Sequence, residues 1–106
     1  YAPGFMLTGV PGAAAVRGMG ILFVMWNIPY LVAFIHPLRF RVSLYESAGM
    51  QALGFVGEML LLAGLPVGYD PLRASILRFV GFDGVGVLLL LLALLLVRQN
   101  AARARV

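Results

Sequence analysis

Apolar residues form three long runs along the chain, separated by short stretches that carry proline, glycine or charge. The runs cover residues 13–35, 44–65 and 71–97, and each is long enough to cross a bilayer as a helix, which takes about 20 mainly apolar residues. Residues 1–12 hold two prolines and three glycines, which disfavour a helix but leave the segment apolar. The pattern predicts an all-α integral membrane bundle. A single domain would comprise an interfacial loop, three transmembrane helices and a basic tail over 98–106.

The residues at the ends of the runs support these boundaries. Pro37 ends the first run because proline cannot continue a helix. Ser43 and Glu46 have the spacing of a capping box, which predicts that the second helix starts at residue 44 and gives Glu46 a structural role. Asp70 followed by Pro71 joins a good N-cap to a good first helical residue, so the third helix is expected to begin there.

The composition agrees with a membrane protein. Of 106 residues, 62% are hydrophobic and 11% are charged, whereas soluble domains carry about 25% charged residues. A chain of this size buries only about 60 to 70% of its unfolded surface. The remaining apolar surface is therefore expected to meet the lipid bilayer or other integral membrane subunits. The net charge of +4 comes from scattered arginines near the run ends, so no nucleic-acid partner is expected.

The distribution of arginine predicts the orientation. Arg39 and Arg41 lie between the first two runs, and Arg98, Arg103 and Arg105 lie in the tail. Three spans place these two segments on the same side, which the positive-inside rule makes cytoplasmic. The expectation is a multi-pass protein of a bacterial-type inner or plasma membrane, with a cytoplasmic C-terminus. If a further helix precedes the first residue, the protein has four spans and both ends inside.

Signatures of soluble enzymes are missing from the sequence. The chain has no cysteine, which excludes disulfides, thiolate metal ligands and thiol catalysis within it. It has no glycine-rich phosphate loop, no paired histidines and no nucleophile elbow. We therefore expect a protein that is not an enzyme and has no metal site or dedicated cofactor, although contact with a quinone or a pigment stays open.

Three charged residues are predicted to lie in the outer half of the membrane. If the midpoint of each run marks the bilayer centre, Glu58 lies about 5 Å, Arg78 about 9 Å and Arg17 about 10 Å toward the outside. Antiparallel packing of the second and third helices would bring Glu58 close to Arg78, with Arg17 as a further partner. The group is either a buried ion pair that fixes the helix register or a site that moves protons or binds an anion.

A second polar layer is expected nearer the bilayer centre. Asn27 and Gln51 fall about 5 Å toward the inside, and Asp83 lies within about 2 Å of the centre. The second run also carries a helical stripe that should face protein, made of Ser47, Gln51, Gly54 and Glu58. Gly81, Gly84 and Gly86 surround Asp83, which indicates either a tight helix crossing or room for a ligand.

Aromatic residues and the single histidine are the candidates for cofactor contact. Trp26 and Tyr30 flank Pro29, which is expected to kink the first helix. Their rings would fill a bundle, and a quinone or a pigment would use the same surface. His36 is a candidate metal ligand for a haem or chlorophyll, or an ordinary residue of the interfacial belt of aromatic and basic side chains.

Two stretches resemble a known family. Residues 17–23, Arg-Gly-Met-Gly-Ile-Leu-Phe, resemble the first span of DoxX-like membrane proteins, and residues 52–65, with Glu58 among glycines and leucines, resemble the second span. The resemblance implies a small four-span bundle with a quinone-linked redox or stress function, in which Arg17 and Glu58 form the polar pair. The chain departs from that pattern because it shows three spans, and residues 78–83 have no counterpart.

Three functions are compatible with these features. The leading hypothesis is a non-catalytic accessory or stabilising subunit of a larger integral membrane complex, with energy-converting respiratory or photosynthetic complexes among the candidates. The first alternative is a protein with its own activity: a DoxX-like redox helper, or a small proton or anion carrier that uses Arg17, Glu58 and Arg78. The second alternative is a subunit that binds a pigment.

Overall fold

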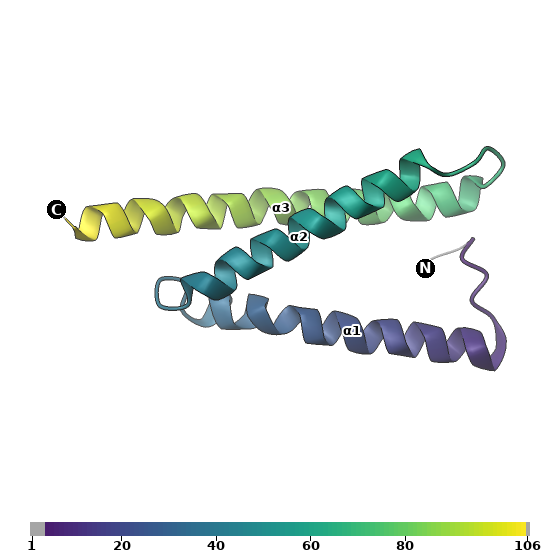
Figure 1. Ribbon diagram of the computed structural model, residues 1–106, viewed down its shortest axis with the longest axis horizontal. Coiled ribbons are helices and arrows are strands. Elements are labelled where there is room, and N and C mark those ends of the chain that lie inside the picture. Colours follow the sequence, from purple (N-terminus) through teal and green to yellow (C-terminus); the bar gives the residue numbers. More distant parts are fainter. Residues whose placement is uncertain (1–3, 106) are drawn as a thin grey trace.

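Three α-helices make up the fold of the computed structural model, which describes residues 4–105. They are α1 (Gly9–Ile35), α2 (Arg41–Ala63) and α3 (Asp70–Ala104). Helix α2 runs antiparallel along α3, while α1 meets α2 near the loop that joins them and then diverges (Figure 1). The molecule measures 58 × 29 × 17 Å. The prediction of an all-α protein is confirmed.

Helix α1 begins earlier than the sequence predicts. The expected interfacial loop over residues 1–12 is wrong for its last four residues, because the helix starts at Gly9. Pro11 lies in the first turn, where the backbone N–H group that proline lacks would have no acceptor in the helix. Pro29 lies inside α1, and the helix continues past it to Ile35.

Helix α2 also starts before its predicted first residue. It begins at Arg41, its N-cap is Phe40, and no side chain caps it. The predicted capping box is therefore wrong. Ser43 lies within the first turn, and its carbonyl accepts a hydrogen bond from the Ser47 hydroxyl at 2.7 Å.

Helix α3 is longer than expected at its C-terminal end. Asp70 is its first residue, after the N-cap Tyr69, and Pro71 lies in the first turn. The helix continues through most of the predicted basic tail, to Ala104. Alanine and arginine have high helix propensity, so the helix does not end where the leucine run ends.

Two of the helices, α1 and α3, are long and apolar enough to cross a membrane. Helix α2 is not one of them, since its 23 residues include an arginine and two glutamates. The assignment of α2 as a span stays a prediction. Within residues 4–105, α1 makes no backbone contact with α3. The expected bundle is therefore an α2–α3 pair to which α1 is attached at one end.

The apolar core is small and lies where the three helices come together. Ala33, Leu44 and Val97 are buried there. Of the long leucine run in α3, Leu90 and Leu94 pack against this cluster. The other leucines of that run are exposed, namely Leu88, Leu89, Leu91, Leu92, Leu95 and Leu96.

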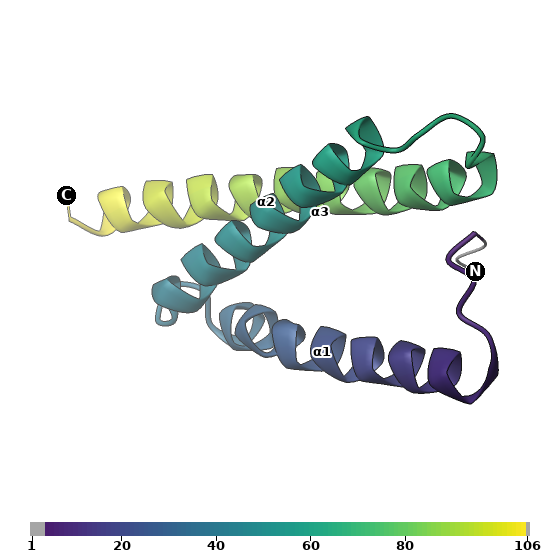
Figure 2. The same cartoon turned by 45° about the vertical axis from the view of Figure 1, so that its right-hand side comes forward.

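Helix α1 and the α2–α3 pair diverge from each other toward one end of the molecule. At that end, the segment before α1 returns toward the start of α3 (Figure 2). The rings of Phe5 and Phe79 lie 6.3 Å apart. Gly4 has a φ of +93°, and a Cβ at this position would lie 2.6 Å from the backbone nitrogen of Leu72. Glycine is required at this position both by its backbone conformation and by the close approach to α3.

Candidate functional site

The α2–α3 crossing is close because glycines leave room for larger side chains. A Cβ added to Gly86 would lie 2.5 Å from Gln51 Nε2, and one added to Gly84 would lie 3.1 Å from the Phe55 ring. On α2, a Cβ added to Gly54 would lie 3.2 Å from an Asp83 carboxylate oxygen. Gly84 and Gly86 therefore lie at the tight helix crossing, whereas a Cβ added to Gly81 would meet no atom within 4 Å.

Gln51 is the centre of a hydrogen-bonded network at this crossing. The Tyr30 hydroxyl of α1 donates to Gln51 Oε1 at 2.7 Å. Gln51 Nε2 in turn donates to Asp83 Oδ1 at 2.9 Å and to the Asp83 carbonyl at 3.2 Å. The side-chain amide thereby links all three helices, and the predicted stripe of Ser47, Gln51, Gly54 and Glu58 lies against α3 as its periodicity indicates.

Glu58 extends this network by a second carboxyl group. Its side chain lies beside the Asp83 side chain, close enough for the two carboxyl groups to interact. Two carboxyl groups at this separation can form a hydrogen bond only when one of them carries a proton, since two carboxylates only accept. The Oε2 atom of Glu58 is buried and has no hydrogen-bond partner. The pair is therefore able to hold a proton and to exchange it, which is the chemistry available at this site.

The structure does not bring the predicted outer layer together. Arg78 donates to the Ala74 carbonyl at 3.3 Å and to the Ser75 hydroxyl at 3.4 Å, both on its own helix. The expected ion pair with Glu58 is therefore wrong. Arg78 lies five residues before Asp83, about 7.5 Å along the helix, whereas Glu58 lies at the level of Asp83.

Arg17 is separated from both of these residues. It lies on α1 in a shallow surface depression with Gly20, Ile21, Val24 and Met25. Within residues 4–105 it makes no hydrogen bond or ion pair. The predicted polar partnership of Arg17 with residues of the other two helices is thus absent from the described chain.

The remaining candidates have local roles. Asn27 Nδ2 donates to the Phe23 carbonyl of its own helix at 2.7 Å, so of the predicted midplane layer only Gln51 and Asp83 meet. The Trp26 and Phe23 rings are 6.0 Å apart and nearly perpendicular. His36 Nδ1 accepts the backbone N–H of Arg39 at 3.2 Å, within the turn that joins α1 to α2. Cofactor roles for Trp26, Tyr30 and His36 stay predictions.

Two contacts of the network do not follow from the sequence pattern. The midpoints of the runs place Glu58 and Asp83 in different layers, although the depths differ by only about 4 Å along the helix axes, which a glutamate side chain can reach. For Tyr30 the pattern indicates a role of the ring and not of the hydroxyl. A buried or half-buried tyrosine hydroxyl usually has a hydrogen-bond partner, and that rule was the available signal.

Comparison with models of protein families, with curated proteins and with solved structures finds no match for this chain. The resemblance to DoxX-like proteins accordingly stays a prediction.

Proposed function

We propose that this protein is a non-catalytic subunit of a larger integral membrane assembly, and that α1 is the helix that packs against another subunit. The proposal depends mainly on one observation. Arg17 has no partner within residues 4–105, while Gln51 and Asp83 bond to each other at the α2–α3 crossing. In this proposal all three helices cross the membrane, and the C-terminal end is cytoplasmic.

The free-energy cost of placing the charged Arg17 side chain in the membrane supports a partner outside the described chain. It lies eight residues after Gly9, about 12 Å along the helix, and is therefore at bilayer depth if α1 spans the membrane. An arginine at the bilayer centre costs about 2.5–3.5 kcal/mol on insertion scales unless it is paired, and Arg17, about 10 Å from the centre, carries part of that cost. A carboxylate or a backbone carbonyl of a neighbouring helix would remove that cost.

The surface of α1 around Arg17 also suits a helix partner. An added Cβ at Gly18 or Gly20 would meet no atom within 4 Å, so nothing in the described chain uses these two small residues. Small residues allow another helix to approach closely. Apolar side chains nearby are exposed, with Val24 at 70% and Ile21 at 63%.

Photo-crosslinking in native membranes tests this proposal. A crosslinking residue at Val24 should capture another polypeptide, and the protein should purify with that polypeptide at fixed stoichiometry in mild detergent. The same residue at Leu92, on the exposed side of α3, is the matched control and should capture lipid. Arg17→Leu should release the partner, whereas Arg103→Leu should not. A protein that purifies as a clean monomer or homodimer would exclude the proposal.

The Glu58–Asp83 pair favours a second candidate, a small proton carrier. A shared proton inside a membrane helix pair is a common element of proton pathways. In proteoliposomes, Glu58→Gln should abolish proton flux, because a glutamine amide does not release a proton near neutral pH. Glu46→Gln is the control, since Glu46 is exposed on the same helix. Flux that is unchanged in Glu58→Gln would exclude the carrier.

A further inference from the structure

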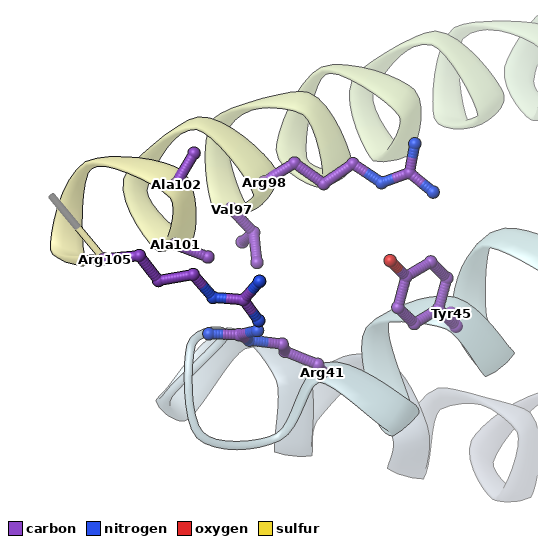
Figure 3. A pocket seen from close by; sticks show the side chains of 7 residues that line it. All are labelled: Arg41, Tyr45, Val97, Arg98, Ala101, Ala102 and Arg105. Carbon is purple, nitrogen blue, oxygen red and sulfur yellow. The ribbon is translucent and has the colours of Figure 1, made fainter.

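The start of α2 and the end of α3 enclose a cleft with an unusual concentration of arginine. Its volume is about 230 Å³. Arg41 and Tyr45 of α2 face Arg98, Ala101, Ala102 and Arg105 of α3 across it (Figure 3). Arg98 and Arg105 are seven residues apart, which is about two helical turns, so both project from the same face.

Arginine side chains reach the cleft from the start of α2 and from the end of α3. Figure 3 shows the guanidinium groups of Arg41 and Arg105 close to each other, while that of Arg98 extends past the Tyr45 ring, away from the other two. All three side chains line the cleft. Two positive charges therefore meet in this space, and a third lies at its wall.

Within residues 4–105, no carboxylate lines the cleft. Glu46 follows Tyr45 in the sequence, but it is exposed and does not line the cleft. Arg41 already uses its Nε to donate to the Leu38 carbonyl at 3.1 Å, which leaves the two terminal nitrogens for another acceptor.

Helix dipoles explain the arginines of α3 but not Arg41. Basic residues near a helix C-terminus are stabilised by the negative end of the dipole, with or without a ligand. Arg41 is the first residue of α2, where the dipole is positive and disfavours a cation. No side chain caps this end of α2, so its first-turn N–H groups also favour an anion.

We infer that the cleft binds a phosphate-bearing anion through Arg41, Arg98 and Arg105. Arginine forms paired hydrogen bonds with phosphate oxygens, and guanidinium groups from two helices would hold the group between them. Ala101 and Ala102 line the α3 side of the cleft, and their short side chains leave space for the phosphate group. The volume exceeds that of several water molecules at about 30 Å³ each, so a phosphate group fits. This inference is independent of whether α1 binds another subunit.

The phosphate could come from a lipid headgroup or from a soluble compound. Val97 lines the cleft, and the exposed leucines of α3 precede it, so an acyl chain could follow the helix away from the site. The recognised chemistry is the same for both sources, and the experiment below separates them.

The test measures binding to the purified full chain in mild detergent. The probes are phosphatidylglycerol, phosphatidylcholine and inorganic phosphate, and the readouts are native mass spectrometry and ³¹P NMR line broadening. The double variant Arg41→Gln/Arg105→Gln should weaken binding at least about tenfold, as expected for the loss of two charge-assisted contacts. Arg39→Gln/Arg103→Gln removes the same charge outside the cleft and should change binding less than about twofold.

The outcomes separate the sources and can overturn the inference. If inorganic phosphate binds and displaces phosphatidylglycerol, the ligand is a soluble phosphate. If phosphatidylglycerol binds alone and survives excess phosphate, the ligand is a lipid. Equal losses in both double variants would show only bulk surface charge, and no binding of any probe would equally overturn the inference. Single variants replace the double one if its helical circular dichroism is altered.

Discussion

Helix α1 and the α2–α3 pair use their polar residues in different ways. At the α2–α3 crossing, Gln51 bonds to Asp83, the Glu58 carboxyl lies beside that of Asp83, and Gly86 leaves room for the Gln51 side chain. On α1, Arg17 has no partner in residues 4–105. Polar side chains that meet one another mark an interface within the chain, whereas an isolated one on an apolar helix indicates an interface outside it.

The two regions also differ in how they are held. Helices α2 and α3 cross obliquely and share the most extensive helix contact in the described residues, whereas α1 and the segment before it are held at two places (Figure 1). Near its C-terminal end, Tyr30 bonds to Gln51 and Ala33 joins the core. Before its N-terminal end, Phe5 packs on Phe79. The middle of α1 is therefore the part that is free to bind a neighbour.

The largest expected effect comes from filling the space at the α2–α3 crossing. Gly86→Ala should destabilise the pair by about 2–3 kcal/mol, because the new Cβ overpacks against Gln51 and displaces it from its hydrogen bonds. Gly81 has no atom near an added Cβ, so Gly81→Ala should instead stabilise the helix by up to about 1 kcal/mol. Denaturant unfolding in micelles, followed by circular dichroism, measures both. Equal effects at the two positions would contradict the close crossing.

Removing the centre of the network should have the next largest effect. Gln51→Leu leaves the Asp83 carboxyl and the Tyr30 hydroxyl without their bonds, at about 1–2 kcal/mol for two interhelical hydrogen bonds. Asn27→Leu is the control, since Asn27 is exposed and bonds only to its own helix. Its effect should stay within about 0.5 kcal/mol. The same unfolding assay measures both variants. A larger loss of stability for Asn27→Leu than for Gln51→Leu would contradict the role of Gln51 as the centre of the network.

The α2–α3 pair is also the part that the sequence predicts best. The stripe from Ser47 to Glu58 repeats with helical period, and polar groups in an apolar run must face protein, so its contact with α3 follows from the pattern. The short hairpin before Asp70 makes the two helices antiparallel neighbours. The partner of Glu58 does not follow, because side-chain reach and helix crossing shift contacts by several ångström relative to a count of residues.

The placement of α1 is what the sequence could not predict. Hydropathy measures how apolar a helix is, but a surface such as that of Ile21 and Val24 suits lipid, a neighbouring subunit or the chain itself equally well. The divergence of α1 depends on packing at Tyr30 and Ala33, near one end of the helix. The cleft at Arg41 was likewise hidden, since the arginines that line it are separated by more than 50 residues (Arg41 to Arg98).

A smaller effect is expected where the segment before α1 meets α3. Phe5→Ala removes a ring pair that contributes about 1 kcal/mol, so the outer end of α1 should move away from α3. Spin labels at Ala14 and Ala74, both exposed, report this as a longer and broader distance distribution. Phe34 is 85% exposed, and Phe34→Ala should leave the distribution unchanged. An unaltered distance in Phe5→Ala would show that the ring contact does not hold α1.

The smallest expected effect tests whether the two regions are independent. Tyr30→Phe removes one interhelical hydrogen bond, about 0.6 kcal/mol, and keeps the ring. The same spin labels should show a broader distribution, because α1 loses its polar link to Gln51. Unfolding of the α2–α3 pair should hardly change, since Gln51 keeps its bonds to Asp83. Tyr69→Phe is the control, with Tyr69 exposed beside the hairpin. If Tyr30→Phe destabilises the pair as much as Gln51→Leu does, the hydroxyl is part of the crossing itself, and α1 belongs to one bundle with α2 and α3.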